Sequence, residues 1–168
     1  MKGLRRFTVV GCMAAMAGGA WAGPLAPTKA SQVVTVATTP GSPVCPFGST
    51  GKVIDTLQKP DATTASFSIP PGSVLVITEV EISASKASSA GDLCEIDLIL
   101  GTASSFSRVA THEALCDASG EISGTLTVPT GAVVKPGSAL CAVGFDATLG
   151  VPLGGTFAVV HGFLAKDN

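Results

Sequence analysis

The sequence is poor in aromatic, charged and histidine residues. Tyr is absent, Trp occurs once, His occurs twice, and charged residues make up only 13% of the chain. So few imidazoles leave little material for a histidine-based active site, and so few aromatic rings argue against sugar binding by stacking. Lys and Arg form no run beyond residue 6. A nucleic-acid binder with a basic patch is therefore not expected.

Motifs that mark common catalytic sites are missing as well. The sequence has no G-x-S-x-G elbow, no G-x-x-x-x-G-K-[ST] phosphate loop, no G-x-G-x-x-G fingerprint and no H-E-x-x-H metal motif. His112 and Glu113 are neighbours, so on a strand they point to opposite faces and cannot work as a base and its orienting acid. His161 alternates with apolar residues, which predicts a packed or hydrogen-bonded strand histidine. We expect a protein that is not an enzyme.

The N-terminus has the three parts of a secretory signal. Positive residues within positions 2–6 precede an apolar run, and residues 20–22 (Ala-Trp-Ala) form a small-x-small cleavage site. The apolar run is shorter than the about 20 residues that span a bilayer, so we expect removal of residues 1–22 rather than a retained anchor. Removal takes away three of the ten Lys and Arg residues and none of the 12 acids, which leaves a net charge of −5.

Four cysteines remain after this cleavage, and none is spaced as a C-x-x-C motif. An even number in an exported chain predicts two disulfides, which can connect in three ways. A hairpin centred at Ser105 would place Cys94 opposite Cys116 and favours that pair. Cys45 and Cys141 would then tie the N-terminal segment to a late strand. A link between Cys94 and Cys45 would contradict this choice.

Short apolar runs alternate with turn residues along the rest of the chain. A flexible N-terminal segment at residues 23–31 precedes one domain at residues 32–168. The spacing predicts an all-β fold: a single antiparallel β-sandwich, jelly-roll-like, with about 8–10 short strands. Residues 104–116 also fit a helical stripe, but we favour a strand because the neighbouring runs are strands. The predicted runs are 33–38, 52–57, 65–69, 73–83, 93–100, 105–115, 121–128, 132–134, 139–146 and 155–164.

The run at residues 73–83 leads to an acidic site. Strict alternation gives it one buried face, made by Val74, Val76, Val80 and Ile82. If it forms a hairpin with residues 93–100, the opposite face gathers four carboxylates, those of Glu79, Glu81, Glu95 and Asp97. Like charges directly opposite destabilise a sheet. A slipped register or splayed side chains on a solvated face would relieve the repulsion, and so would a cation or a basic partner surface. Calcium, which prefers oxygen ligands, is the candidate cation.

Two segments carry a resemblance to a known group. Residues 69–80, IPPGSVLVITEV, resemble the I-P-x-G-x-x-L-V-I-x-x-V strand opening of small uncharacterised exported bacterial proteins with jelly-roll-like sandwiches. Residues 159–164, VVHGFL, are similar to the closing G-aromatic-L strand of the same group. The resemblance implies the fold and brings no catalytic residues with it.

These observations lead to two expectations about function. The first is a secreted or periplasmic, non-enzymatic protein that acts through protein–protein contact or surface assembly. Its extended N-terminal segment would add to a neighbour's sheet. The alternative is a module that binds calcium or a cationic ligand on the acidic sheet face. Neither involves nucleic acid, or a membrane span once the signal is removed.

Overall fold

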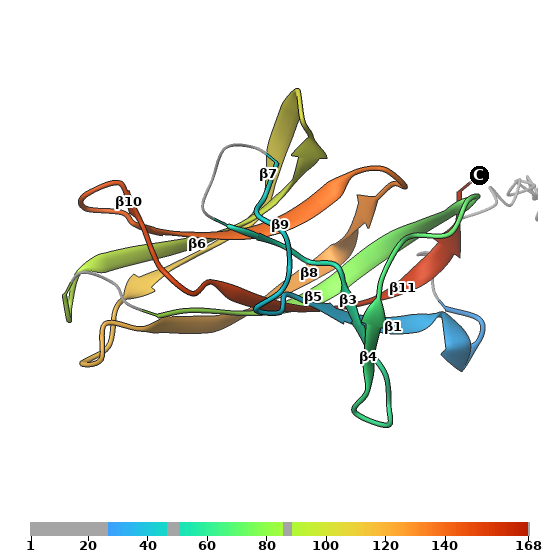
Figure 1. Cartoon of the computed structure of the whole chain (residues 1–168), viewed down its shortest axis with the longest axis horizontal. Helices are drawn as coiled ribbons and strands as arrows, with labels where there is room; N and C mark the ends of the chain where they lie inside the picture. The colour runs from blue at the N-terminus through green and yellow to red at the C-terminus, as the bar shows by residue number, and fades with distance from the viewer. Residues whose placement is uncertain (1–26, 47–50, 86–88, 168) are drawn as a thin grey trace, which may run out of the picture.

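The computed structural model describes residues 27–46, 51–85 and 89–167, which contain eleven strands and one 3-10 helix. The strands form two antiparallel sheets packed face to face (Figure 1), which confirms the predicted all-β sandwich. The predicted signal, residues 1–22, and residues 23–26 lie outside the described residues. The elements are η1 (Ala30–Gln32), β1 (Val33–Ala37), β2 (Lys52–Val53), β3 (Thr56–Gln58), β4 (Thr64–Ser66), β5 (Ser73–Ala84), β6 (Leu93–Thr102), β7 (Ser105–Leu115), β8 (Ile122–Val134), β9 (Ala139–Asp146), β10 (Val151–Pro152) and β11 (Phe157–Lys166).

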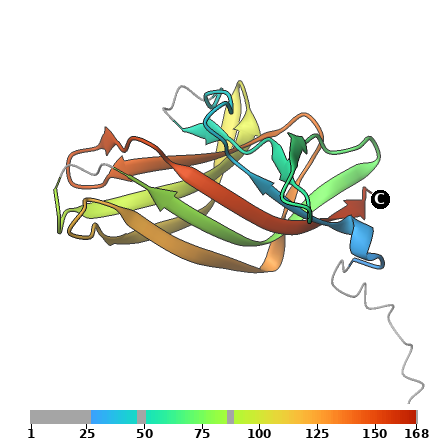
Figure 2. The ribbon, with the colours of Figure 1, turned by 60° about the horizontal axis from the view of Figure 1, so that its bottom comes forward.

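The chain crosses repeatedly between the two sheets. Sheet A has the strand order β4-β3-β1-β11-β5-β8, and sheet B has the order β10-β9-β6-β7, with β2 also paired to β9. Each of the steps β5 to β6, β7 to β8, β8 to β9 and β10 to β11 changes sheet. Strands far apart in the sequence therefore become neighbours, and β11 lies between β1 and β5 (Figure 2).

The core lies between the sheets and is built from alternate residues of the long strands, with one extra residue, Thr78, interrupting this pattern in β5. Ile77 and Val80 of β5, Ile96 and Leu98 of β6, and Val160 of β11 are all fully buried. The residues between them point to the outer faces, as the two-residue period of a strand requires. Polar groups on these central strands are therefore presented on two opposite outer surfaces.

The predicted alternation along β5 is wrong at Thr78, because the strand contains a bulge there. In the ladder with β11, His161 lies opposite Glu79, and the next residue, Gly162, lies opposite Ile77. Thr78 is thus an extra residue in β5 with no partner of its own in this ladder. An inserted residue shifts the alternation by one position and reverses the face of everything on one side of it.

The bulge separates the apolar residues that alternation had placed together. Val80 and Ile82, after the bulge, face the core. Val74 and Val76, before the bulge, lie on the outer face of sheet A and pack with Phe163. The prediction that these four residues share one buried face is therefore wrong.

β8 is one strand where the sequence predicted two. The predicted break at residues 129–131 is an irregularity inside the strand: Thr127 lies opposite Glu79, and Ala132 lies opposite Ile77. Residues 105–115 and 139–146 are strands with the predicted bounds, so a helix at residues 104–116 is excluded. The two-residue strand β10 was not expected.

Both predicted disulfides are present. Cys45 is bonded to Cys141, with a Cα–Cα distance of 5.9 Å, and Cys94 is bonded to Cys116, with a distance of 5.8 Å. Disulfides of this kind fit an oxidising environment. In the described part of the chain, no helix is long and apolar enough to cross a membrane.

The register used to predict the second disulfide is wrong by two residues. The β6–β7 hairpin turns directly after Thr102 and carries a bulge next to Leu98. Cys94 therefore lies opposite Ala114, and Cys116 reaches it from just beyond the end of β7. The pairing survived this error because the two cysteines still close the same hairpin.

β1 occupies a central place in its own sheet. It pairs with β11 on one side and with β3 on the other, and Val36 and Ala37 are buried. β1 is therefore a strand of the sandwich itself and begins after the N-terminal segment at residues 23–31. Addition of that segment to a neighbour's sheet stays a prediction.

Candidate functional site

The four carboxylates of the predicted acidic site lie on two opposite faces of the molecule. β5 pairs with β8 and β11 in sheet A, whereas β6 pairs with β7 and β9 in sheet B, so the predicted hairpin between them does not exist. Glu79 and Glu81 consequently lie on the outer face of sheet A, and Glu95 and Asp97 on the outer face of sheet B. Each strand buries its apolar side against the other sheet, and this turns the two acidic sides away from each other.

The sheet B pair is bridged by an arginine. Arg108 Nη1 lies 2.8 Å from Glu95 Oε1, and Arg108 Nη2 lies 2.8 Å from Asp97 Oδ2. Thr111 Oγ1 donates a 2.8 Å hydrogen bond to Asp97 Oδ1. Both oxygens of Asp97, whose side chain is only 1% exposed, therefore already have partners. In this arginine cluster (Glu95, Asp97 and Arg108), the guanidinium already contacts both carboxylates, so the pair does not offer a free cation site.

The Glu95 carboxyl of the arginine cluster has a raised pKa. Burial raises the pKa of the Glu95 carboxyl above its usual range, and the adjacent Asp97 raises it further. Arg108 acts in the opposite direction and lowers the pKa, while the charge of Glu113 adds a smaller upward contribution. Desolvation and like charge thus outweigh the guanidinium in setting the direction of the shift.

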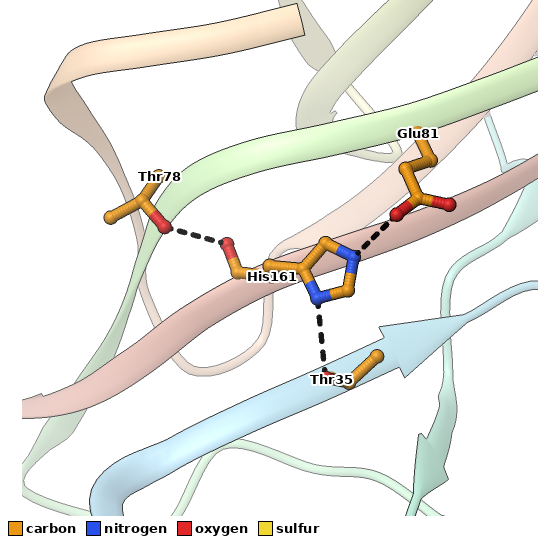
Figure 3. Close-up of polar contacts among 4 residues, drawn as sticks. All are labelled: Thr35, Thr78, Glu81 and His161. Carbon is orange, nitrogen blue, oxygen red and sulfur yellow. Dashed lines mark hydrogen bonds and ion pairs between the residues drawn. The ribbon is translucent and has the colours of Figure 1, made fainter. Parts of the chain in front are cut away.

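The sheet A pair is joined by a histidine. Glu79 and Glu81 from β5 and His161 from β11 each offer one ligand atom, and these three atoms lie within 4.8 Å of one another. His161 Nε2 donates to Glu81 Oε1 at 3.1 Å (Figure 3). The side chain of His161 is 36% exposed and that of Glu81 is 57% exposed, so solvent ions can reach both. We call these three residues the histidine–glutamate cluster.

Two threonines fix the histidine of this cluster. Thr35 Oγ1, on β1, lies 3.3 Å from His161 Nδ1. Thr78, the bulge residue of β5, donates a 3.2 Å hydrogen bond from its hydroxyl to the backbone carbonyl of His161. Figure 3 shows both contacts on opposite sides of β11. Thr35 thus holds the imidazole ring at Nδ1, and Thr78 holds the backbone of β11 at the same residue. The other ring nitrogen, Nε2, is directed at Glu81.

The neighbouring positions on this face are also polar. Thr35 and Gln58 continue the row beyond the histidine on β1 and β3, and Thr125 and Thr127 of β8 lie opposite the two glutamates. The histidine–glutamate cluster is therefore the charged centre of a hydroxyl- and amide-lined band that crosses sheet A. Outside this band, the apolar group that contains Phe163 covers one end of the face.

The third member of the cluster was missed from the sequence. His161 was expected as a packed or hydrogen-bonded strand histidine, and it is hydrogen-bonded, but nothing local linked it to Glu79 and Glu81. The link depends on the pairing of β11 with β5, which are about 80 positions apart in the chain. Alternation along β11 places His161 on the same face as Val159 and Phe163, so the local sequence gave no signal for a ligand at this position.

An apolar cavity of about 210 Å³ lies between the sheets, and none of the residues that line it belongs to the histidine–glutamate cluster. Its polar lining is limited to Asp55, Ser68, Ser138 and backbone groups. Asp55 Oδ1 accepts hydrogen bonds from Ser42 and Thr56. The cavity brings together no pair of acid and base groups and is less informative about function than the histidine–glutamate cluster. It is lined by Val36, Val53, Ile54, Asp55, Phe67, Ser68, Ile69, Leu75, Val134, Gly137, Ser138, Ala139 and Leu140.

Comparison with known proteins adds no family to this description. No protein-family model matches the chain, and no curated protein matches it. Function is therefore inferred from the residues that the fold brings together.

Proposed function

We propose that this chain is a secreted or periplasmic, non-enzymatic β-sandwich that binds a divalent transition-metal ion at Glu79, Glu81 and His161. The observation that carries the proposal is the approach of one donor atom from each residue to within 4.8 Å of the others. In a tetrahedral zinc site the ligand atoms lie about 2.0–2.2 Å from the ion and therefore about 3.3–3.6 Å from one another. Side-chain rotations on this exposed face would bring the three donor atoms to that spacing.

The donor set favours zinc, copper or nickel over calcium. Imidazole nitrogen suits these metals, whereas calcium takes about 6–8 oxygen ligands and has no preference for nitrogen. A site with one histidine and two carboxylates therefore differs from the calcium site expected for four carboxylates. Three protein ligands leave room for water or for a donor from a partner molecule.

Thr35 supports both the free and the metal-bound histidine. When the neutral ring carries its proton on Nε2, this nitrogen donates to Glu81 and Nδ1 accepts from the hydroxyl of Thr35. Metal binding at Nε2 requires the ring proton to sit on Nδ1, which then donates to the same hydroxyl. A hydroxyl can donate or accept, so the ring keeps its orientation in both states.

Titration calorimetry on the chelator-treated protein tests this proposal. We expect Zn²⁺ to bind with one ion per chain and more tightly than Ca²⁺. His161→Gln and Glu81→Gln should each weaken Zn²⁺ binding about ten-fold or more, and Thr35→Val, which removes only the supporting hydroxyl, about ten-fold. Affinity should also fall on acidification, because protons compete with the metal for imidazole and carboxylate.

Matched controls use residues of the same type outside the cluster. Glu113→Gln and Glu121→Gln also remove one negative charge each but should leave the Zn²⁺ affinity unchanged. No binding heat for Zn²⁺ would contradict the proposal. A Zn²⁺ affinity that His161→Gln does not change would contradict it as well, because the ion would then bind without the histidine.

A further inference from the structure

The open edges of the two sheets differ in their protection against pairing with another strand. An edge strand presents unpaired N–H and C=O groups, and short length, charges or bulges usually prevent further pairing. Among the described elements, β4 has three residues, and β2 and β10 have two each. β7 is longer, but it carries Arg108 and Glu113 and has a bulge in its ladder with β6. All these edges are protected.

The β8 edge has none of these protections over residues 122–128. This segment reads ISGTLTV, with no charged residue and no proline. Residues 122–127 pair without interruption with β5, and the irregular part of the strand begins only afterwards. Ser123, Thr125 and Thr127 are exposed on its outer face. Figure 2 shows β8 as the outermost strand of sheet A.

We propose that this edge pairs with the same edge of a second copy of the chain. Residues 122–128 of the two protomers would form an antiparallel ladder about a two-fold axis at Thr125, the centre of the segment. An antiparallel arrangement lets identical segments satisfy each other's backbone groups, and closed two-fold contacts are the commonest in homo-oligomers. The segment itself brings no charged side chain to the contact.

The other end of sheet A limits the assembly to two copies. Its edge strand, β4, has only three residues, so the joined sheet offers no second long edge for growth. The two Thr125 side chains become cross-strand neighbours, and threonine pairs of this kind stabilise antiparallel sheets. A charged side chain at position 125 should therefore change the strength of the dimer.

Sedimentation velocity over a concentration series, with chelator present to exclude metal-bridged association, tests the pairing. We expect the wild-type protein to dimerise. Thr125→Lys and Thr125→Glu, which place like charges side by side, should each weaken the dimer about three- to five-fold. An equimolar mixture of the two variants should restore it, because opposite charges then meet. Thr64→Lys and Thr64→Glu, on the opposite edge of the same sheet, should have no effect.

Hydrogen exchange provides a second measurement that does not depend on the variants. Amides of residues 122–128 should exchange more slowly in the concentrated wild-type protein than in the dilute one. A wild-type chain that stays monomeric at all concentrations would overturn the proposal. So would a dimer that Thr64 substitutions weaken as much as Thr125 substitutions, or a mixture of the Thr125 variants that stays monomeric.

Discussion

At the residue scale, Glu95 links the stability of the fold to pH. Its pKa is raised in the folded protein, chiefly by burial and by Asp97. A raised carboxyl pKa means that the protonated form is favoured on folding. The resulting stabilisation is fully present below the unfolded pKa and is lost as the pH rises through the folded pKa.

Replacing Glu95 by Gln should therefore flatten the dependence of stability on pH. Between about pH 4 and pH 7, the free energy of unfolding of the wild type should include a contribution that falls with rising pH, and Glu95→Gln should lack it. Near pH 7 the variant should be as stable as the wild type or slightly more stable. Urea unfolding across this range measures the slope. Glu121→Gln, at an exposed position, is the control, and an unchanged slope in Glu95→Gln would contradict the assignment.

Ala62 gives a second prediction at this scale. It is the one non-glycine residue with positive φ in the described part of the chain, at 62°, in the turn between β3 and β4. The left-handed conformation is costly for alanine and is better tolerated by asparagine. Ala62→Asn should therefore raise the free energy of unfolding by about 0.5–1 kcal/mol. A lower melting temperature in a thermal scan would show that the turn is not strained.

At the element scale, β7 and β8 meet through a histidine and a glycine. A Cβ atom on Gly124 of β8 would lie 2.5 Å from ring atoms of His112 on β7, so the ring occupies the space that a side chain would need. The absence of a side chain at position 124 thus lets the two edge strands approach. This contact concerns the packing of the two sheets and has no part in the proposed metal binding or in the proposed dimer.

Gly124→Ala should destabilise the fold by about 1–3 kcal/mol through this overlap. Adding His112→Ala should recover part of the loss, because the smaller side chain vacates the space. A double-mutant cycle from chemical unfolding measures the coupling. Gly41→Ala is the control, since a Cβ there meets nothing within 4 Å. Additive effects of the two substitutions would contradict the contact.

The elements themselves could be predicted better than their partners. Residues 105–115 and 139–146 have local alternation and turn residues at both ends, and these signals depend only on neighbours in the sequence. The bulge at Thr78 has no such signal, because an extra residue in a strand looks like any other strand residue. The pairing of His161 with Glu79 depends on two strands that are about 80 positions apart in the sequence.

At the scale of the whole molecule, the acidic site shows the same limit. Glu79 and Glu81 could be identified as candidates because their charges interrupt an apolar run. Their assignment to one patch with Glu95 and Asp97 failed because chain proximity favoured a hairpin. The two strands instead lie in different sheets, because each buries its apolar face against the other sheet. This arrangement depends on the packing of the whole core and cannot be recognised from the loop between the two strands.

The two disulfides should differ in their contribution to global stability. Cys45–Cys141 has a sequence separation of 96 and Cys94–Cys116 one of 22. The chain-entropy model assigns about 4–5 kcal/mol to the longer closure and about 3–3.5 kcal/mol to the shorter one. Replacing both cysteines of a pair by Ser and measuring denaturant midpoints tests this order. A larger loss for the Cys94–Cys116 variant would show that local strain or packing outweighs loop length.

The extra residue at Thr78 lies outside the alternation of β5 and can be lost without turning either half of the strand over. Without it, the two halves join in one regular alternation, with Leu75, Ile77, Val80 and Ile82 toward the core. Glu79 and Glu81 would then still point outward, and the strand would lose its bulge and the hydrogen bond from Thr78 to the carbonyl of His161. Among descendants of this sequence, a one-residue deletion at position 78 should therefore preserve both faces of the strand.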